Sequence, residues 1–247
     1  MTPARPVKAR IGEPREKEAG RKDAGKPPNF TVAGARHATA GLPFARAAYA
    51  LSVHDPAELP APGAPEIAFA GRSNAGKSSA INALAGRRRL AFVSKTPGRT
   101  QLINFFALEG RAYLVDLPGY GYAGVPLEVR RHWEHLVGTY VAERPSLALV
   151  VVVMDCRHPM SPLDLRLLDW LRAAGRPSLV LLTKADKLSK QAARVTLERV
   201  RSELAKAYPG ATAQLFSSLK HEGTAEAARA LARFAGAAKN KAPAKGE

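Results

Sequence analysis

The chain has 247 residues, of which 46% are hydrophobic, so it can bury the core of one ordinary domain. Its single cysteine, Cys156, excludes an internal disulfide framework. No apolar run approaches the ~20 residues of a membrane-spanning helix, and the N-terminus lacks the apolar centre of a secretory signal. These features predict a cytoplasmic protein with no membrane span. The net charge of +17 predicts attraction to polyanions, although an Arg-rich composition would also serve solubility alone.

The positive charge is not confined to the ends of the chain. Residues 1–26 carry +4 and residues 237–247 carry +2, so +11 of the +17 remains for the residues between them. Residues 1–40 are rich in Lys, Arg, Pro, Gly and Ala and lack a periodic apolar pattern, which predicts a disordered basic arm. We therefore expect one globular domain over residues 41–236 and a flexible basic tail over residues 237–247.

The regular alternation of strands and helices is expected to begin at residue 66. Before it, the apolar side chains Phe44, Tyr49, Leu51 and Val53 are expected to pack onto the domain edge, and four prolines between residues 56 and 65 keep the backbone extended. From there, strand-like and helix-like patterns alternate. Strands are predicted at 66–70, 101–108, 111–116, 147–154, 178–183 and 213–216, and helices at 77–86, 126–143, 162–174, 190–207 and 224–236.

This alternation predicts an α/β fold. The runs Leu147–Val153 and Ser178–Leu182 are continuously apolar, which is typical of parallel strands buried on both faces. Glu109-Gly110 predicts a tight turn joining an antiparallel pair. The sequence thus predicts a doubly wound, mostly parallel six-stranded sheet with one antiparallel edge strand, helices on both faces, and ligands at the carboxyl ends of the strands.

Residues 71–78 read Gly-Arg-Ser-Asn-Ala-Gly-Lys-Ser, the G-x-x-x-x-G-K-S pattern of phosphate-binding loops. The pattern lies between a predicted strand and a predicted helix, a context that disfavours a simple glycine turn before a surface helix. Gly71 and Gly76 let the backbone curl so that its N–H groups face a phosphate. Lys77 is then expected to reach the β- and γ-phosphates, and Ser78 to bind Mg²⁺.

A second motif is expected beside this loop. A predicted strand ends in Asp-Leu-Pro-Gly, 39 residues after the P-loop lysine, so Asp116 would hold Mg²⁺ through a water and Gly119 would donate its N–H to the γ-phosphate. Many GTPases follow this glycine with a glutamine that orients the attacking water, but this chain has Tyr120. We therefore expect slow intrinsic hydrolysis, completed by a partner or by the flexible loop 120–126.

The base of the nucleotide is indicated by residues 183–186, Thr-Lys-Ala-Asp, at the end of another predicted strand. In this motif, Asp186 accepts hydrogen bonds from the N1–H and 2-amino groups of guanine, and the Lys184 stem lies over the purine. Adenine lacks that donor pair, and an unpaired buried carboxylate is costly, so an ATPase is disfavoured. Residues 216–218, Phe-Ser-Ser, follow the last strand, where a backbone N–H can bind guanine O6, although serine pairs are usually mere turn residues.

The interval before Asp116 contains Lys-Thr-Pro-Gly-Arg-Thr-Gln, residues 95–101. In GTPases the first switch lies here, and one of its threonines binds Mg²⁺ and the γ-phosphate. We expect Thr100 in this role, with Thr96 as the alternative; a plain solvated loop would leave the ion one ligand short. Arg99 is open to two interpretations, a positive finger on the phosphate or, as we favour, a charge that faces solvent or rRNA.

Taken together, these motifs resemble those of the EngB (YihA/YsxC) family of bacterial Era-like GTPases. GRSNAGKSS, KTPGRTQLINFF, DLPGYGYA, DCRH, TKAD and FSS occur in that family's order, and the likeness covers about residues 42–236. DCRH, residues 155–158, stays open both to a loop-fixing salt bridge and to a functional role. The resemblance implies a P-loop GTPase fold and a cytoplasmic, Mg²⁺-dependent GTPase that assists large ribosomal subunit assembly and is needed for normal cell division and septation.

The same resemblance implies partners and site residues. The partners are GTP or GDP, the large-subunit precursor and its rRNA, with no DNA specificity, and a monomer is expected. A function of a different class is a basic rRNA-binding module in which nucleotide is structural. Lys77, Thr100 and Gly119 are assigned to catalysis, and Mg²⁺ to Ser78, Thr100 and, through water, Asp116. The expected nucleotide contacts are Gly71, Arg72, Ser73, Asn74, Ala75, Gly76, Lys77, Ser78, Gly98, Arg99, Thr100, Gln101, Leu102, Asp116, Leu117, Pro118, Gly119, Thr183, Lys184, Ala185, Asp186, Phe216, Ser217 and Ser218.

Overall fold

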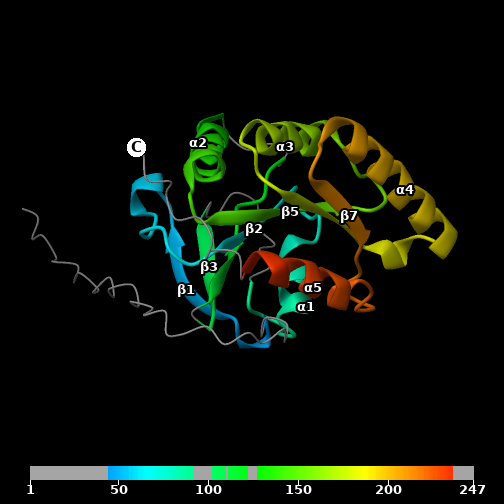
Figure 1. Cartoon of the computed structure of the whole chain (residues 1–247), viewed down its shortest axis with the longest axis horizontal. Helices are drawn as coiled ribbons and strands as arrows, with labels where there is room; N and C mark the ends of the chain where they lie inside the picture. The colour runs from blue at the N-terminus through cyan, green and yellow to red at the C-terminus, as the bar shows by residue number, and fades with distance from the viewer. Residues whose placement is uncertain (1–43, 92–101, 110, 122–126, 236–247) are drawn as a thin grey trace, which may run out of the picture.

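The computed structural model describes residues 44–91, 102–109, 111–121 and 127–235, and it confirms an α/β fold with one sheet between two layers of helices (Figure 1). Each strand and helix predicted from residue 66 onward is present, with ends that differ by at most two residues. The elements are η1 (Phe44–Arg46), β1 (Ala48–Val53), η2 (Pro56–Glu58), β2 (Glu66–Gly71), α1 (Lys77–Leu84), β3 (Ile103–Leu108), β4 (Ala112–Asp116), α2 (Leu127–Glu143), β5 (Leu147–Asp155), α3 (Pro162–Ala173), β6 (Ser178–Thr183), η3 (Ala185–Lys187), α4 (Lys190–Ala207), β7 (Ala211–Leu215) and α5 (Thr224–Ala235).

The sheet has the order β1-β3-β4-β2-β5-β6-β7. Strands β4, β2, β5, β6 and β7 pair in parallel, whereas β3 is antiparallel to both of its neighbours, β4 and β1. β2 lies in the middle of this order, so the phosphate-binding motif that follows it is placed between the ends of β4 and β5. The doubly wound, mostly parallel arrangement agrees with the sequence-based prediction.

The predicted strand count was one too low, because β1 extends the sheet beyond β3. The antiparallel strand that we expected at the edge is therefore an inner strand. Tyr49, Leu51 and Val53 do alternate as in a strand, but the pairing with β3 shifts register between Tyr49 and Leu51, and much of β1 is exposed. A short, bulged strand with one open face lacks the continuous apolar run that marks the buried strands.

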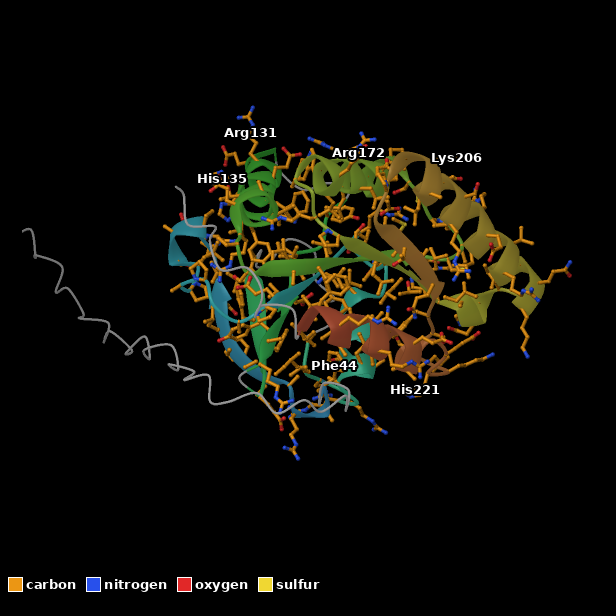
Figure 2. The ribbon with its side chains drawn as sticks, in the orientation of Figure 1. Phe44, Arg131, His135, Arg172, Lys206 and His221 are labelled. Atoms are coloured by element: carbon orange, nitrogen blue, oxygen red, sulfur yellow. The ribbon has the colours of Figure 1, made fainter. Side chains whose placement is uncertain are left out.

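Successive side chains of each central strand pack into two separate hydrophobic cores, one on each face of the sheet. Val150 and Val152 of β5 belong to the core under α2, α3 and α4, whereas Val151 and Val153 belong to the core under α1 and α5. This follows from the two-residue period of a strand. Figure 1 shows the two helix layers on opposite sides of the sheet. Arg131 of α2 and Lys206 of α4 are exposed on the outer side of the first layer (Figure 2).

The helices begin in two different ways. Ser161 caps α3 through a capping box with Asp164, and Ser189 caps α4 by accepting a hydrogen bond from the Ala192 amide. In contrast, α1 begins after Gly76, which has a left-handed backbone and no side-chain cap. The first amides of α1 are therefore left for a ligand, as anion-binding helix ends require.

A buried polar cluster lies at the amino end of β2. We call this side of the sheet, where the parallel strands begin, its amino edge. The Glu66 carboxylate accepts hydrogen bonds from Arg144 Nε (2.9 and 3.0 Å), Tyr140 Oη (2.7 Å) and Ser146 Oγ (2.8 Å). Arg144 Nη1 also donates to the Pro60 carbonyl at 2.7 Å. Because each charged group has several partners, this cluster fixes α2 and the start of β5 against β2.

Within the described ranges, none of the helices has the length and apolarity needed to cross a bilayer. The predicted basic arm, residues 1–40, and the predicted tail, residues 237–247, lie outside those ranges. The domain limits therefore stay predictions, as does the monomeric state.

Candidate nucleotide site

Backbone geometry at two glycines shapes the loop between β2 and α1. A Cβ atom on Gly71 would lie 2.7 Å from the Val153 carbonyl oxygen of β5, a contact that backbone atoms cannot relieve. Gly76 has φ of +99°, in the left-handed region that favours glycine. Asn74 also has positive φ, +62°, and the Ala75 amide donates to the Arg72 carbonyl at 3.0 Å to close the turn. The loop thus curls as the phosphate-binding pattern requires.

Lys77 and Asp116 meet at the carboxyl ends of β2 and β4, within what we call the carboxyl edge of the sheet. Their side chains form a hydrogen-bonded ion pair and are only 12% and 8% exposed. Among the described residues, each makes this one polar side-chain contact, so the ammonium retains donors and the carboxylate retains acceptors. With the hydroxyl of neighbouring Ser78, the carboxylate offers the hard oxygen donors that Mg²⁺ prefers, so these residues fit the ion.

The segment after β4 lies against the phosphate-binding loop. The Ser73 amide donates to the Tyr120 carbonyl at 2.8 Å, and the Tyr120 amide donates to the Gly71 carbonyl at 3.4 Å. A Cβ built on Gly119 would lie 3.6 Å from both the Gly71 oxygen and the Ser73 nitrogen. Gly119 is therefore in van der Waals range of the loop, as its predicted role at a shared phosphate requires. Leu117 is buried, and its amide donates to the Phe69 carbonyl at 3.0 Å.

The side chain of Tyr120 is anchored between α2 and α3. It is 6% exposed, its hydroxyl donates to Asp164 Oδ1 at 3.1 Å, and its ring centroid lies 5.5 Å from that of Trp133. Burial, together with the Asp164 carboxylate, raises the pKa of Tyr120 well above its ordinary value of 10.0, so the hydroxyl stays a donor. Arg72 Nε lies 3.4 Å from the same carboxylate, and Trp133 Nε1 donates to the Pro118 carbonyl at 2.9 Å. The glutamine position is thus occupied by a structural side chain.

The purine motif is tied to the phosphate-binding loop by its first two residues. The Thr183 hydroxyl donates to the Ala75 carbonyl and lies 3.0 Å from the Met154 carbonyl. Lys184 has positive φ, +57°, and its Nζ donates to the Asn74 carbonyl at 2.7 Å. Thr183 stands where many GTPases have asparagine, and its shorter side chain still reaches the loop.

The end of β7 meets the same motif, because β7 pairs with β6. Buried Ser217 donates its hydroxyl to Asp186 Oδ1 at 2.6 Å. The Phe216 amide donates to the Leu182 carbonyl at 2.9 Å, and the Ser217 amide donates to the Glu222 carbonyl at 2.9 Å. Within the described part of the chain, the Ser218 amide has no hydrogen-bond acceptor. This makes Ser218 the amide of the 216–218 segment that guanine O6 can use.

Sequence reasoning missed one direct partner of the purine motif, the Asp155 carboxylate at the end of β5. Asp155 Oδ2 accepts a hydrogen bond from Lys184 Nζ at 2.9 Å and another from Arg157 Nη2 at 2.7 Å. The salt bridge within residues 155–158 is therefore present, but it also holds the lysine of a separate motif. The position of an acid at the carboxyl end of a central strand was the available signal.

Several predicted contacts fall outside the described residues: Gly98, Arg99, Thr100, Gln101 and the alternative Thr96. Leu102, just before β3, is described and half-buried. The choice between Thr100 and Thr96 thus stays a prediction. The remaining predicted contacts all lie at the carboxyl edge, on β2, β4 and β6, in the segments that follow β2, β4, β6 and β7, or, for Lys77 and Ser78, at the start of α1.

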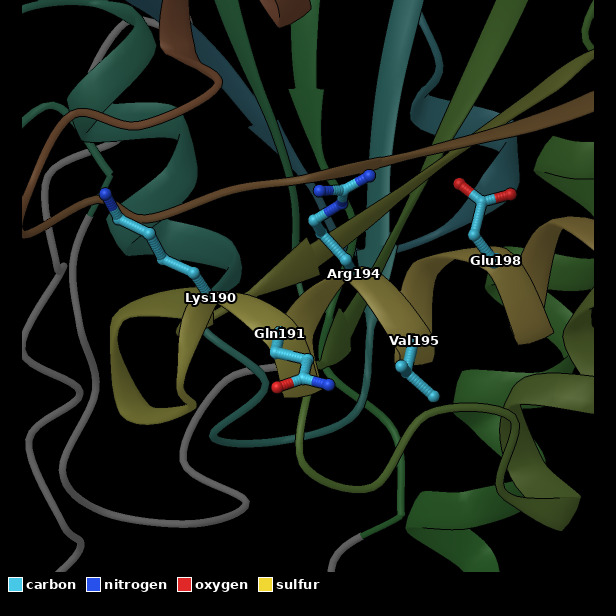
Figure 3. A pocket seen from close by; sticks show the side chains of 5 residues that line it. All are labelled: Lys190, Gln191, Arg194, Val195 and Glu198. Carbon is cyan, nitrogen blue, oxygen red and sulfur yellow. The ribbon is translucent and has the colours of Figure 1, made fainter.

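A depression elsewhere on the surface is lined by residues of α4 alone, whose side chains Figure 3 shows. One helix contributes the whole lining, and neither the phosphate-binding loop nor the purine motif takes part, so we place the site at the carboxyl edge and not there. Its lining residues are Lys190, Gln191, Arg194, Val195 and Glu198.

Comparisons with known proteins agree with this geometry. Residues 66–184 match the family described as 50S ribosome-binding GTPase. The chain is 55% identical, over 77% of its length and 92% of the relative, to the probable GTP-binding protein EngB of Methylobacillus flagellatus. It is 56% identical to the relative of that name from Nitrosomonas europaea, over 76% of this chain and 85% of the relative. A crystal structure of a probable GTP-binding protein engB shares the fold, with a TM-score of 0.55, 23% identity and coverage of 69% of this chain and 98% of that chain.

Proposed function

Because this chain belongs to the EngB family, a family of P-loop GTPases, we propose that it binds Mg²⁺ and GTP, hydrolyses GTP slowly, and acts as a cytoplasmic switch in large ribosomal subunit assembly. The observation that carries this proposal is the convergence of two pairs at one edge of the sheet. Lys77 and Asp116 meet where a triphosphate and its ion would bind, and Asp186 and Ser217 meet where a guanine would bind.

At the phosphate end, the residues of the chain have distinct roles. Lys77 would turn from Asp116 toward the β- and γ-phosphates, and the curled loop amides with the uncapped start of α1 would bind the phosphate oxygens. Ser78 and Asp116 would hold Mg²⁺, the latter through water, and Thr100 would add a ligand. When bound, the ion neutralises charge that develops during phosphoryl transfer.

At the base end, Asp186 supplies selectivity for guanine. Ser217 holds one carboxylate oxygen of Asp186, which fixes the orientation of the group and leaves acceptor capacity for N1–H and the 2-amino group. Asp186→Asn should transfer preference from GTP to XTP, because the amide offers xanthine the donor that its 2-oxo group needs. The test is direct calorimetric titration of wild type and variant with GTP and with XTP; an unchanged GTP preference would refute this assignment of the base.

Turnover is proposed to be slow because Tyr120 takes the place of the usual glutamine. Its hydroxyl is committed to Asp164 and its ring to Trp133, so the side chain supports the loop and does not orient water. Gly119 would contribute its backbone N–H to the γ-phosphate. A partner or residues 120–126 would complete the site, which suits a switch that waits for its target.

The ribosomal role rests on the family and on charge. Residues 27–236 carry +11, and such a surface is attracted to the phosphates of rRNA without specificity for DNA sequence. We propose that GTP orders both switch segments, that this form binds the large-subunit precursor, and that hydrolysis releases it. Effects on cell division and septation would then follow from ribosome assembly or accompany it.

The decisive experiment is sedimentation of the full chain with large-subunit precursor particles, with GDP or a non-hydrolysable GTP analogue. We expect co-migration with the analogue and release with GDP. Equal co-migration in both states, and without nucleotide, would favour the alternative of a basic rRNA-binding module in which nucleotide is structural. No co-migration in any state would contradict the ribosomal role while leaving GTP binding intact.

A further inference from the structure

Asp155 lies between the phosphate-binding loop and the purine motif and contacts the lysine that links them. We propose that Asp155 is a positioning residue for guanine-nucleotide binding that acts through Lys184, an inference that rests on the proposed function. The contact that carries it is the 2.9 Å hydrogen bond from Lys184 Nζ to Asp155 Oδ2, made while the same Nζ donates to the Asn74 carbonyl at 2.7 Å.

These two acceptors hold the Lys184 ammonium at one point. A lysine side chain has four flexible bonds, and ordering it on ligand binding costs conformational entropy. The backbone of Lys184 is already in the left-handed region, with φ of +57°, so both ends of the side chain are fixed before a purine arrives. The stem that is expected to lie over the base is thus preorganised, and Asp155 is the charged half of its anchor.

Asp155 is itself held firmly. The Arg157 amide and Nε both donate to its Oδ1 at 3.0 Å, and Arg157 Nη2 donates to Oδ2 at 2.7 Å. Asp155 pairs with Thr183 in the register of β5 and β6, and the Cys156 amide donates to the Thr183 carbonyl at 2.9 Å. The carboxylate is therefore placed beside Lys184 by the sheet and oriented by Arg157.

The charge state of Asp155 does not change under ordinary conditions. Burial alone would raise the pKa of its carboxyl, but hydrogen bonds from Arg157 and Lys184 hold that pKa well below its ordinary value of 3.8. The group is thus ionised throughout the range in which the protein would work, and its effect on affinity should not vary between about pH 5 and 8.

Simple electrostatics and positioning predict opposite results for Asp155→Asn. Removing a negative charge near a site for a polyanion favours the ligand if only long-range attraction matters. Releasing Lys184 from its anchor disfavours the ligand if preorganisation matters. We expect roughly tenfold weaker GDP binding, the size of effect that loss of one charge-assisted hydrogen bond produces.

A double-mutant cycle separates action through Lys184 from general support of the loop. GDP affinity of the full chain is measured for wild type, Asp155→Asn, Lys184→Ala and the double variant. In the Lys184→Ala background, Asp155→Asn should change affinity less than about twofold. An equal loss in both backgrounds, or unchanged or tighter binding by Asp155→Asn alone, would overturn the proposal.

Two controls complete the design. Asp169→Asn removes an exposed α3 carboxylate that pairs with Arg172, and it should leave GDP affinity unchanged. If Asp155→Asn fails to fold, Arg157→Ala replaces it in the cycle, because the Arg157 side chain is 44% exposed and touches the site through Asp155. Arg157→Ala should weaken GDP binding about threefold with Lys184 present and not without it.

The same assay on Asp186→Asn distinguishes failure of this inference from failure of the proposed function. Loss of GDP binding there, with no effect of Asp155→Asn, would leave the guanine site standing and remove only the positioning role. Wild-type GDP binding by Asp186→Asn would instead refute the guanine site itself.

Discussion

The amino edge of the sheet contains a buried ion pair and the carboxyl edge a largely buried one, but the pairs differ in how many partners they have. At the amino edge, Glu66 is satisfied by Arg144, Tyr140 and Ser146, and Arg144 also binds a carbonyl. At the carboxyl edge, Lys77 and Asp116 have only each other among the described residues. A saturated cluster has no capacity for a ligand, whereas a pair with spare donors and acceptors can exchange its partners. Burial alone therefore does not separate structure from function here; residual hydrogen-bonding capacity does.

The largest change in the free energy of unfolding should come from a substitution at the amino edge. Arg144→Ala leaves the Glu66 carboxylate buried without its cation, which should lower the free energy of unfolding by about 3–5 kcal/mol. GDP affinity of the folded fraction should remain that of wild type. Urea denaturation and GDP titration measure the two quantities, with exposed Arg131→Ala as the control. A variant that keeps its stability but loses GDP binding would reverse the roles that we assign to the two edges.

Lys77→Ala should lower nucleotide affinity, which Arg144→Ala should leave unchanged. GTP affinity should fall by about a hundredfold or more, equivalent to about 3 kcal/mol, because charge-assisted bonds to the phosphates are lost. The free energy of unfolding should fall as well, because the Asp116 carboxylate, only 8% exposed, loses the one partner that the described residues give it. Exposed Lys206→Ala on α4 removes the same charge without touching the site. Near-wild-type GTP binding by Lys77→Ala would contradict the phosphate assignment.

The smallest change in stability and activity is expected for Tyr120. This residue lies at the carboxyl edge, but its hydroxyl is bound to a protein group, as are the groups of the amino edge. Tyr120→Phe removes one donor from buried Asp164 and should lower the free energy of unfolding by about 1 kcal/mol. Single-turnover phosphate release should not slow, because the hydroxyl is not at the reacting phosphate. Tyr49→Phe, at an exposed hydroxyl, is the matched control. A marked fall in turnover at unchanged GTP affinity would instead make Tyr120 part of the reaction.

Much of the fold could be predicted because the decisive signals are local. Continuous valine and leucine runs identified β5 and β6, and the motif between β2 and α1 placed the phosphate end of the site. β1 was missed because its strand character depends on pairing with β3, some 50 residues away, through a bulged register. Alternation over so few residues predicts packing as readily as it predicts a strand.

The site shows the same division. Asp116 and Asp186 could be assigned because each stands in a motif of fixed spacing. The pairing of Asp155 with Lys184 could not, since 29 residues separate them and only the register of β5 and β6 brings them together. Similarly, Tyr120 could be recognised as a departure from glutamine, but its anchor on Asp164 depends on how α3 packs. Motif spacing identifies the groups that touch a ligand, whereas the groups that hold them are set by tertiary structure.

Asp164 has two roles: its Oδ2 accepts the capping-box hydrogen bonds of Ser161 at the start of α3, and its Oδ1 accepts the hydrogen bond of Tyr120. Because both oxygens belong to one carboxylate, a rearrangement that withdraws Tyr120 from Oδ1 frees the group to turn and so to alter the hydrogen bonds between Oδ2 and Ser161 in the first turn of α3. Amide hydrogen exchange in that turn would therefore report the state of the neighbouring loop at a distance, even if the sheet stays still. The exchange rates of the first amides of α3 therefore monitor the position of Tyr120, and the measurement needs no label on the nucleotide.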